Sequence, residues 1–281
     1  MALVIPEVFA DAVNSAMGVA LRVGRVATDF TDMVDEITTY GDKVHFPTID
    51  RISDASTVTK GTPLSPSAVS MTDSYATIKQ VGNSVRIYDR DAIQVKGALK
   101  DRLAEQLGQT MAKAVDKDLI EAIKTDVVYT DSVDSLTAAA INEAFDVFGD
   151  EVDNDDFAGM IINSKLRSII TAMDEFTNVN KTYTPDGNGV VRDGVIGFWN
   201  GTIPVIMSNN GTAYKDGSNV DVLMLAIVKK NALGYVYQKT ATVEEEREGK
   251  LLATDLIASE LYATKLVNTS GVSVLEVPAN P

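Results

Sequence analysis

The sequence predicts an α+β fold, in which long helical patterns and long β patterns occupy separate parts of the chain. Between residues 91 and 126, leucine and other large apolar residues recur at steps of four, as on one side of a helix. Residues 43–52, 69–88 and 232–277 alternate between apolar and polar side chains, as strands do. Residues 127–228 alternate short apolar strands with amphipathic helices. The pattern therefore predicts a long helix flanked by β segments, with a mixed unit inserted between them.

The composition indicates a folded chain with a large core and excludes several kinds of chemistry. The 281 residues are 45% hydrophobic and 23% charged, which is enough to build a substantial core. No cysteine is present, so disulfides and thiolate chemistry are excluded. A formal net charge of -15 argues against a nucleic-acid-binding protein, which needs clustered lysine and arginine. The sequence has no targeting segment and no apolar run of about 18 residues, so we expect neither export nor membrane contact.

The first predicted element is an amphipathic helix over residues 7–26, with apolar residues at spacings of three and four. Two interpretations of this helix stay open. It packs on the body of the protein, or it is an arm that docks on a neighbouring molecule.

Residues 43–52 and 69–88 predict two strands joined by a segment rich in Ser, Thr, Gly and Pro, which favour turns. Two strands joined in this way form a long hairpin with arms of roughly 30 Å. A lone hairpin is marginally stable in water because it cannot bury its faces. We therefore expect it to lie on a partner surface, in its own chain or in another.

The longest predicted helix runs from Asp91 to Asp126, about 50 Å at 1.5 Å per residue. Gly97 and Gly108 each weaken it by about 1 kcal/mol relative to alanine, so packing must hold it. In the mixed unit that follows, "FAGMIIN", "GTIPVIMSN" and "VDVLMLAIV" predict buried strands. The closing stretch "GVSVLEV" predicts a last strand.

The search for catalytic or ligand-binding chemistry finds no motif. His45 is the one histidine, and it lacks a second histidine or a cysteine to complete a catalytic or metal site. The acidic stretch "DEVDNDDF" lacks the residue order of a calcium loop. In "EEERE", residues 244–248, alternate side chains lie on opposite strand faces, which favours an exposed or interface strip. We therefore expect no catalytic residue, no cofactor and no metal site.

Four blocks, taken in their order along the chain, resemble a known family. They are "YGDKVHFPTI", "TKGTPLSPSAVSMTDSYATIKQ", "RDAIQVKGALKDRLAEQLGQTMAKAVDKDLIEAI" and "GVIGFWNGTIPVIMSNN". In this order they resemble the major capsid proteins of tailed bacteriophages, which have the Hong Kong 97-like fold. The resemblance spans nearly the whole chain.

The resemblance implies a division of the chain into the parts of that fold. Residues 1–40 would be an N-terminal arm and residues 41–86 an extended loop over the neighbouring subunit. Residues 87–126 and 229–281 would form the peripheral domain, containing the long spine helix and β strands. Residues 127–228 would form the axial domain at the centre of each capsomer.

The implied function is that of a structural subunit, not an enzyme, which self-assembles into an icosahedral shell around DNA. The implied partners are further copies, in hexamers and pentamers, with separate scaffolding, portal and maturation-protease proteins. The shell would enclose double-stranded DNA without binding it specifically, and the subunit would be assembled in the bacterial host cytoplasm and end in the virion. The predicted subunit-contact residues lie in the extended loop and the acidic strip: His45, Phe46, Thr57, Lys60, Pro63, Leu64, Glu244, Glu246 and Arg247.

Two other function classes stay open at this point. Another self-assembling protein, such as a tail-tube or surface-array subunit, would also have long loops and no active site. A hydrolase that uses only carboxylates, such as a glycosidase, needs two of them about 5 to 9.5 Å apart in a cleft.

Overall fold

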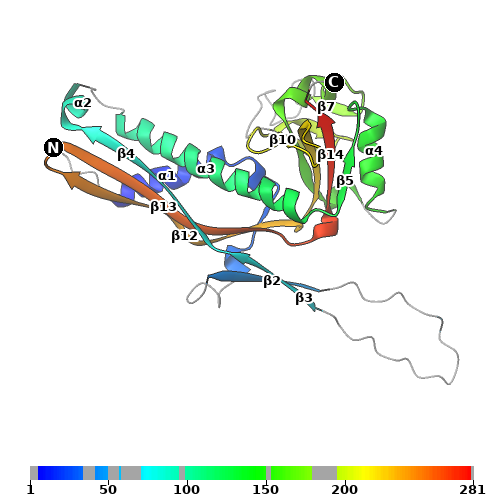
Figure 1. The fold of residues 1–281 in the computed structure, drawn as a ribbon, viewed down its shortest axis with the longest axis horizontal. Coiled ribbons are helices and arrows are strands. Elements are labelled where there is room, and N and C mark those ends of the chain that lie inside the picture. The colour runs from blue at the N-terminus through cyan, green and yellow to red at the C-terminus, as the bar shows by residue number, and fades with distance from the viewer. Residues whose placement is uncertain are drawn as a thin grey trace.

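A computed structural model gives the arrangement of residues 6–33, 42–49, 57, 71–94, 99–149, 153–178 and 195–279. Three parts are visible in Figure 1: an elongated sheet covered by two helices, a compact unit at one end, and a hairpin projecting below. Helices and strands both contribute throughout, so the predicted α+β class is confirmed.

The elongated sheet has the strand order β1-β12-β13-β4. Its central pair is an antiparallel hairpin of two long strands, which twist along most of the molecule's length (Figure 1). Helices α1 and α3 cover one face of this sheet, and both contact its strands. The bounds are Thr28–Asp29 for β1, Leu233–Glu248 for β12, Ala253–Leu266 for β13, Lys79–Tyr88 for β4 and Pro6–Ala20 for α1.

The structure describes two helices in the range of the predicted long helix, on either side of residues 95–98, which are outside the described residues. The short helix α2, Asp89–Gln94, precedes the main helix α3, Leu99–Asp126. The 28 residues of α3 span about 42 Å of the roughly 50 Å expected for the whole rod. Gly97 lies between the two helices, outside the described residues.

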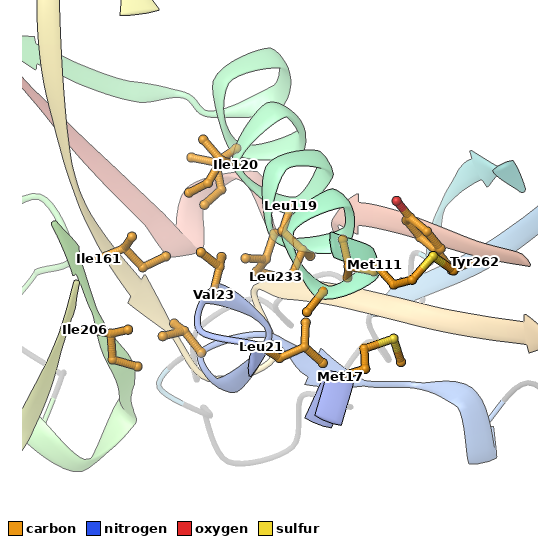
Figure 2. Close-up of a cluster of buried hydrophobic side chains, with 14 of the residues drawn as sticks. Met17, Leu21, Val23, Met111, Leu119, Ile120, Ile161, Ile206, Leu233 and Tyr262 are labelled. Atoms are coloured by element: carbon orange, nitrogen blue, oxygen red, sulfur yellow. The ribbon is translucent and has the colours of Figure 1, made fainter. Parts of the chain in front are cut away.

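The N-terminal helix α1 packs against α3 and β12, which agrees with the first of its two interpretations. Its apolar side chains join a core cluster with α3 and the sheet, and Figure 2 shows Met17 and Leu21 lying beside α3. The helix is shorter than predicted, because the chain turns into a 3-10 helix, η1, at Val23–Arg25.

Gly108 has a packing role at the crossing of α1 and α3. A Cβ atom built there would lie 2.6 Å from the Val13 carbonyl oxygen and 2.9 Å from the Met17 nitrogen. The missing side chain therefore lets the backbone of α1 approach α3 closely. The low helix propensity of glycine at this position is the cost of that approach.

The compact unit is built on an eight-stranded mixed sheet. Strands β6, β9 and β11 lie at its centre, and helices α4 and α5 belong to the same unit. The bounds are Tyr129–Ser132 for β5, Ala138–Asp146 for α4, Phe157–Ile162 for β6, Arg167–Ile170 for α5, Phe176–Asn178 for β7, Val195–Trp199 for β8, Ile203–Met207 for β9, Ala213–Lys215 for β10, Asp221–Lys229 for β11 and Val272–Pro278 for β14. The other 3-10 turns among the described residues are Thr31–Met33 for η2, Asn154–Asp156 for η3, Ser164–Leu166 for η4 and Thr269–Gly271 for η5.

The last strand, which lies in the range 229–281 expected for the peripheral domain, pairs outside the elongated sheet. Strand β14 is hydrogen-bonded to β11 and β5 in the compact unit. Four consecutive residues at its start, from Val272 to Leu275, are buried. Such a strand belongs in a sheet that is covered on both faces. Alternate residues of β14 belong to two different core clusters, so the sheet of the compact unit is covered in this way.

The projecting hairpin consists of β2, Lys43–Ile49, and β3, Met71–Thr77, in antiparallel register. The hairpin strands end at Thr77, before the end of the predicted loop 41–86. Strand β3 stops there, and after Ile78 the chain continues as β4, which pairs with β13 in the elongated sheet. One face of the base of the hairpin packs on that sheet through Val44, Phe46 and Ala76, which lie against Val236 and Ala263.

We predict that Gly108→Ala, at the crossing of α1 and α3, destabilises the protein even though alanine is the better helix former. The gain of about 1 kcal/mol in propensity is outweighed by overlap with the α1 backbone, for which overpacking costs about 1–3 kcal/mol. Urea unfolding measures the difference as a shift in midpoint. An increase in stability would show that the two helices are not in this close contact.

Candidate subunit-contact surfaces

The face of the β2–β3 hairpin that points away from the sheet carries an exposed aromatic and basic group. His45 lies opposite Tyr75 in the register, with ring centroids 6.4 Å apart. The Lys43 ammonium lies 4.3 Å from the centroid of the Tyr75 ring, and Tyr75 is 55% exposed. Tyrosine is enriched where proteins meet, because its ring is apolar and its hydroxyl is polar.

Phe46, predicted as a contact residue, lies on the buried side of the hairpin. It is 4% exposed and packs edge-on against Phe30, with ring centroids 5.9 Å apart. Its packing anchors the hairpin within the chain, so we remove Phe46 from the candidate surface. Of the predicted tip residues, Thr57 is exposed, and three lie outside the described residues: Lys60, Pro63 and Leu64.

A second candidate surface, the acidic face, lies on the side of the elongated sheet away from the helices. Glu246 is opposite Asp255, which is opposite Arg86 on β4. Glu244 and Glu248 share this face because alternate strand side chains point the same way, as predicted for the "EEERE" strip. Within the described residues, Glu244 and Glu246 are exposed and have no ionic partner.

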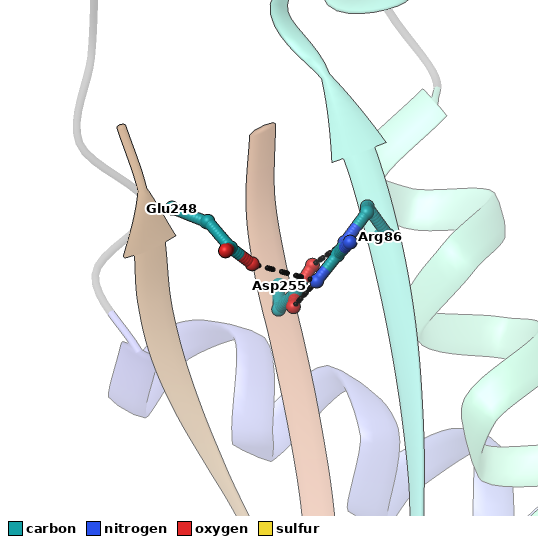
Figure 3. A network of polar contacts seen from close by, with 3 residues as sticks. All are labelled: Arg86, Glu248 and Asp255. Atoms are coloured by element: carbon teal, nitrogen blue, oxygen red, sulfur yellow. Dashed lines mark hydrogen bonds and ion pairs between the residues drawn. The ribbon is translucent and has the colours of Figure 1, made fainter. Parts of the chain in front are cut away.

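Arg86 pairs with two acids of this face, Asp255 and Glu248 (Figure 3). Its guanidinium donates two hydrogen bonds to Asp255, at 2.7 and 2.6 Å, and one to Glu248 at 3.0 Å. The hydrogen bond from Arg86 lowers the pKa of Asp255. Because this network is exposed, its contribution to stability is small. Its main effect is to fix the three strands side by side and to leave Glu244 and Glu246 available.

Arg247 already has an ionic partner in its own chain. Its guanidinium donates two hydrogen bonds of 2.6 Å to the carboxylate of Asp89 and one of 3.1 Å to the hydroxyl of Thr254. The hydrogen bond from Arg247 lowers the pKa of Asp89. This pair ties the end of β12 to the start of α2, and a contact between Arg247 and another copy stays a prediction.

Asp116 joins three separate parts of the chain. The carboxylate, on α3, is fully buried and accepts hydrogen bonds from the backbone N–H groups of Arg22, Val23 and Gly24, at 3.0 to 3.3 Å. It also accepts one from the side-chain amide of Asn210 at 3.4 Å. Burial raises the pKa of Asp116, and the four donors act in the opposite direction.

This junction fixes the compact unit to the elongated sheet. Asn210 lies in the segment between β9 and β10, and the Arg22 guanidinium donates to the carbonyl of Met207 at 3.1 Å. Val23 packs beside Ile120 in the same core (Figure 2). The N-terminal turn, the long helix and the compact unit therefore share one buried ionic group.

The burial of Asp116 could have been predicted from the sequence, although the series of large apolar residues spaced four apart does not include it. Asp116 lies four residues after Ala112 and four before Ile120, both fully buried, so it shares their side of the helix. A carboxylate in the middle of an apolar stripe is expected to have a buried partner. The identity of that partner, a turn 93 residues away, has no sequence signature.

The hollow of the compact unit that contains two carboxylates does not resemble an active site. It lies between β5 and α4, has a volume of about 280 Å³ and is lined by Asp131 and Glu143, both of which are exposed. A carboxylate general acid needs a partly dry surrounding that keeps its proton in place. Among the described residues no group of three potential metal ligands occurs, and none of the described helices is long and apolar enough to cross a membrane.

Comparisons with known proteins support a structural role. A sequence model of the family described as "Phage capsid protein" matches residues 72–272. No curated protein is similar to the chain in sequence.

Solved phage head structures share the fold across nearly the whole chain. The capsid of Ralstonia phage GP4 matches with a TM-score of 0.67 at 14% identity, covering 91% of this chain and 88% of that one. The head structure of Helicobacter pylori bacteriophage KHP40 matches with a TM-score of 0.67 at 11% identity, covering 92% and 91%. A chain from Mycobacterium phage Che8 gives 0.63 at 20% identity, covering 90% of each. The expected Hong Kong 97-like fold is therefore confirmed.

We predict that Asp116→Ala destabilises the subunit by at least about 2 kcal/mol. The buried backbone N–H groups of Val23 and Gly24 would lose their acceptor, as would the part-buried N–H of Arg22, and each unsatisfied buried group costs about 1–3 kcal/mol. Denaturant unfolding of the purified chain measures this loss. Glu105→Ala, at an exposed carboxylate on the same helix, is the matched control and should change stability by less than about 0.5 kcal/mol. A loss for Asp116→Ala as small as that of the control would contradict the junction.

Proposed function

The chain belongs to the phage capsid protein family and is a shell-forming structural subunit, and we propose that its β2–β3 hairpin completes the shell by lying over a neighbouring copy. The observation that carries this proposal is the half-covered hairpin. One face of its base is buried in its own chain, whereas Lys43, His45 and Tyr75 lie on the other, exposed face. A two-stranded sheet with an open face is marginal in water and needs a partner.

The acidic face supplies a partner surface for the hairpin tip. Lys60 is the single charged residue between Asp54 and Asp73, so the tip carries one positive charge. Glu244 and Glu246 are exposed carboxylates without an ionic partner among the described residues. We propose that Lys60 of one copy meets these carboxylates of the next. Complementary charges of this kind set the register of an interface more than its strength.

The domain roles follow the same proposal. The compact unit acts as the axial domain, and the elongated sheet with α1 and α3 acts as the peripheral domain. Strand β14 is assigned to the axial domain because it pairs there. Family membership favours the capsid subunit over a tail-tube or surface-array protein, and the exposed carboxylates of the hollow offer no support for a hydrolase.

The finer partners are part of the proposal too. We propose that the subunits form hexamers and pentamers in the host cytoplasm, with a separate scaffolding protein, portal and maturation protease. The shell encloses double-stranded DNA without specific binding, consistent with the net charge of -15. The subunit has no catalytic role in this proposal.

We predict that deleting residues 56–66, the hairpin tip, leaves a folded subunit that does not form stable particles. The deletion removes a contact made by every copy and leaves the base of the hairpin, with Val44, Phe46 and Ala76, in place. Circular dichroism and urea unfolding check the fold, and sedimentation with electron microscopy checks assembly. Normal particles from the deleted chain would contradict the proposed role of the hairpin.

We predict that Lys60→Glu lowers particle yield and that Glu246→Lys in the same chain restores it. An exposed ion pair contributes at most about 1 kcal/mol, but it is repeated in every copy of the shell, so charge reversal acts on the whole assembly. Asp131→Lys is the matched control, because it makes the same change of charge at an exposed site on the compact unit. The proposed pairing is wrong if Asp131→Lys restores the particle yield of Lys60→Glu to the same extent as Glu246→Lys.

A further inference from the structure

A buried carboxyl group without a partner among the described residues lies on the helix-covered face of the elongated sheet. Glu260, on β13, has no exposed surface, and among the described residues neither of its side-chain oxygens has a hydrogen-bond partner. Buried carboxylates are normally paired or hydrogen-bonded, because an isolated charge is costly away from water. Glu260 has no part in the subunit contacts proposed above, so its burial needs another explanation.

The strand register shows which elements cover Glu260. It lies between Ala258 and Tyr262 on the inner face of β13, and all three residues are fully buried. The hydroxyl of Tyr262 donates to Asp118 on α3 at 2.9 Å, so this face points toward the helices. On β12 the register shifts between Lys239 and Thr242, which are paired with the two neighbours of Glu260. Glu260 therefore faces the irregular part of β12.

In the described part of the chain, no positive charge pairs with Glu260. On β4 the Lys79 ammonium is 3.3 Å from Asp118 of α3, and on β12 Lys239 is exposed. The second acidic group of α3 near this face, Asp116, is held by backbone N–H groups. On α1 the side chain of Asp11 is exposed, and that of Glu7 lies outside the described residues. The two acids of α3 near this face, Asp116 and Asp118, already have partners of their own.

Two further polar atoms in this region lack partners among the described residues. The hydroxyl of Tyr237, on β12, is buried and unpaired, as is the side-chain carbonyl oxygen of Asn14, on α1. Burial raises the pKa of Tyr237, and the nearby carboxyl of Glu260 adds to this. The amide nitrogen of Asn14 donates to the carbonyl of Ala241 at 3.0 Å, which places α1 over the irregular part of β12. The contact between α1 and the sheet thus contains several unsatisfied polar groups.

Burial raises the pKa of Glu260 from 4.5 to about 7. Between these two pH values the packed state keeps a proton that a water-exposed Glu260 has already released. The stability of the packed state therefore falls as the pH rises through this window, and it levels off above about 7. Once ionised, the carboxylate needs water or a cation, and neither can reach it while the helices stay packed.

Helix α1 is the element that can open at the lower cost. It has 15 residues and packs mainly on α3 and β12. The 28-residue helix α3 contacts α1, β4, β12 and β13 and connects the two sheets. Elements with fewer buried contacts open more often than the central ones. Opening α1 would uncover the irregular part of β12 that Glu260 faces, and water could then reach the carboxyl group together with Tyr237 and Asn14.

We propose that Glu260 is a proton-controlled latch for the N-terminal helix: the neutral carboxyl keeps α1 packed on the sheet, and ionisation releases it. The latch acts within one subunit and does not depend on the hairpin contact between copies.

Hydrogen exchange of the full-length chain between about pH 5 and about pH 8 tests this proposal. After correction for intrinsic exchange, the protection of the α1 amides should fall by up to about tenfold per pH unit up to about pH 7, because release is linked to one proton. Above that pH the protection should level off. The amides at the centre of α3 should keep their protection over the whole range. In Glu260→Gln, a neutral variant of the same size, the protection of α1 should be nearly independent of pH.

Glu143→Gln, at an exposed carboxyl on α4 of the compact unit, is the matched control and should keep the wild-type profile. If Glu260→Gln does not fold, Glu260→Leu is measured in its place. The proposal is overturned if α1 protection in the wild type is constant across this range, or if the fall persists undiminished in the neutral variant.

Discussion

In the function that we propose for this chain, the open face of the β2–β3 hairpin is the constraint on which the rest depends. A two-stranded sheet cannot bury both faces by itself, and here the chain covers only one face of the base, through Val44, Phe46 and Ala76. The opposite face leaves Tyr75 more than half exposed. Every subunit of a shell has identical copies as its neighbours. We infer that the surface of such a neighbouring copy covers the open face of the hairpin.

A projecting hairpin can serve this role only if its base is held in a fixed place, and the buried carboxylate of Asp116 contributes to that. By accepting hydrogen bonds from Arg22, Val23 and Gly24 together with Asn210, it joins the N-terminal turn, the long helix and the compact unit. The close approach of α1 at Gly108 adds a second fixed contact, between α1 and α3.

The sequence predicted the order of the elements well, because periodicity reports which face of an element is buried. The sequence was a poorer guide to which sheet each strand joins, because this depends on pairing between distant strands. The break at Ile78, which moves residues 79–88 into the elongated sheet, and the pairing of β14 in the compact unit both depend on distant strands. Among the contact residues, Phe46 was misplaced because alternation gives two faces without saying which one is covered. The alternation of residues 244–248 was correct, but the partner of Arg247 lies on a separate element.

Electron microscopy of the purified full-length chain, combined with small-angle scattering of its unassembled fraction, decides whether the subunit is completed by identical copies. We expect closed shells, and a free subunit that is more extended than a globule of 281 residues, whose radius of gyration would be about 19 Å. A protein that stays monomeric under all assembly conditions and scatters as a compact globule would contradict this expectation.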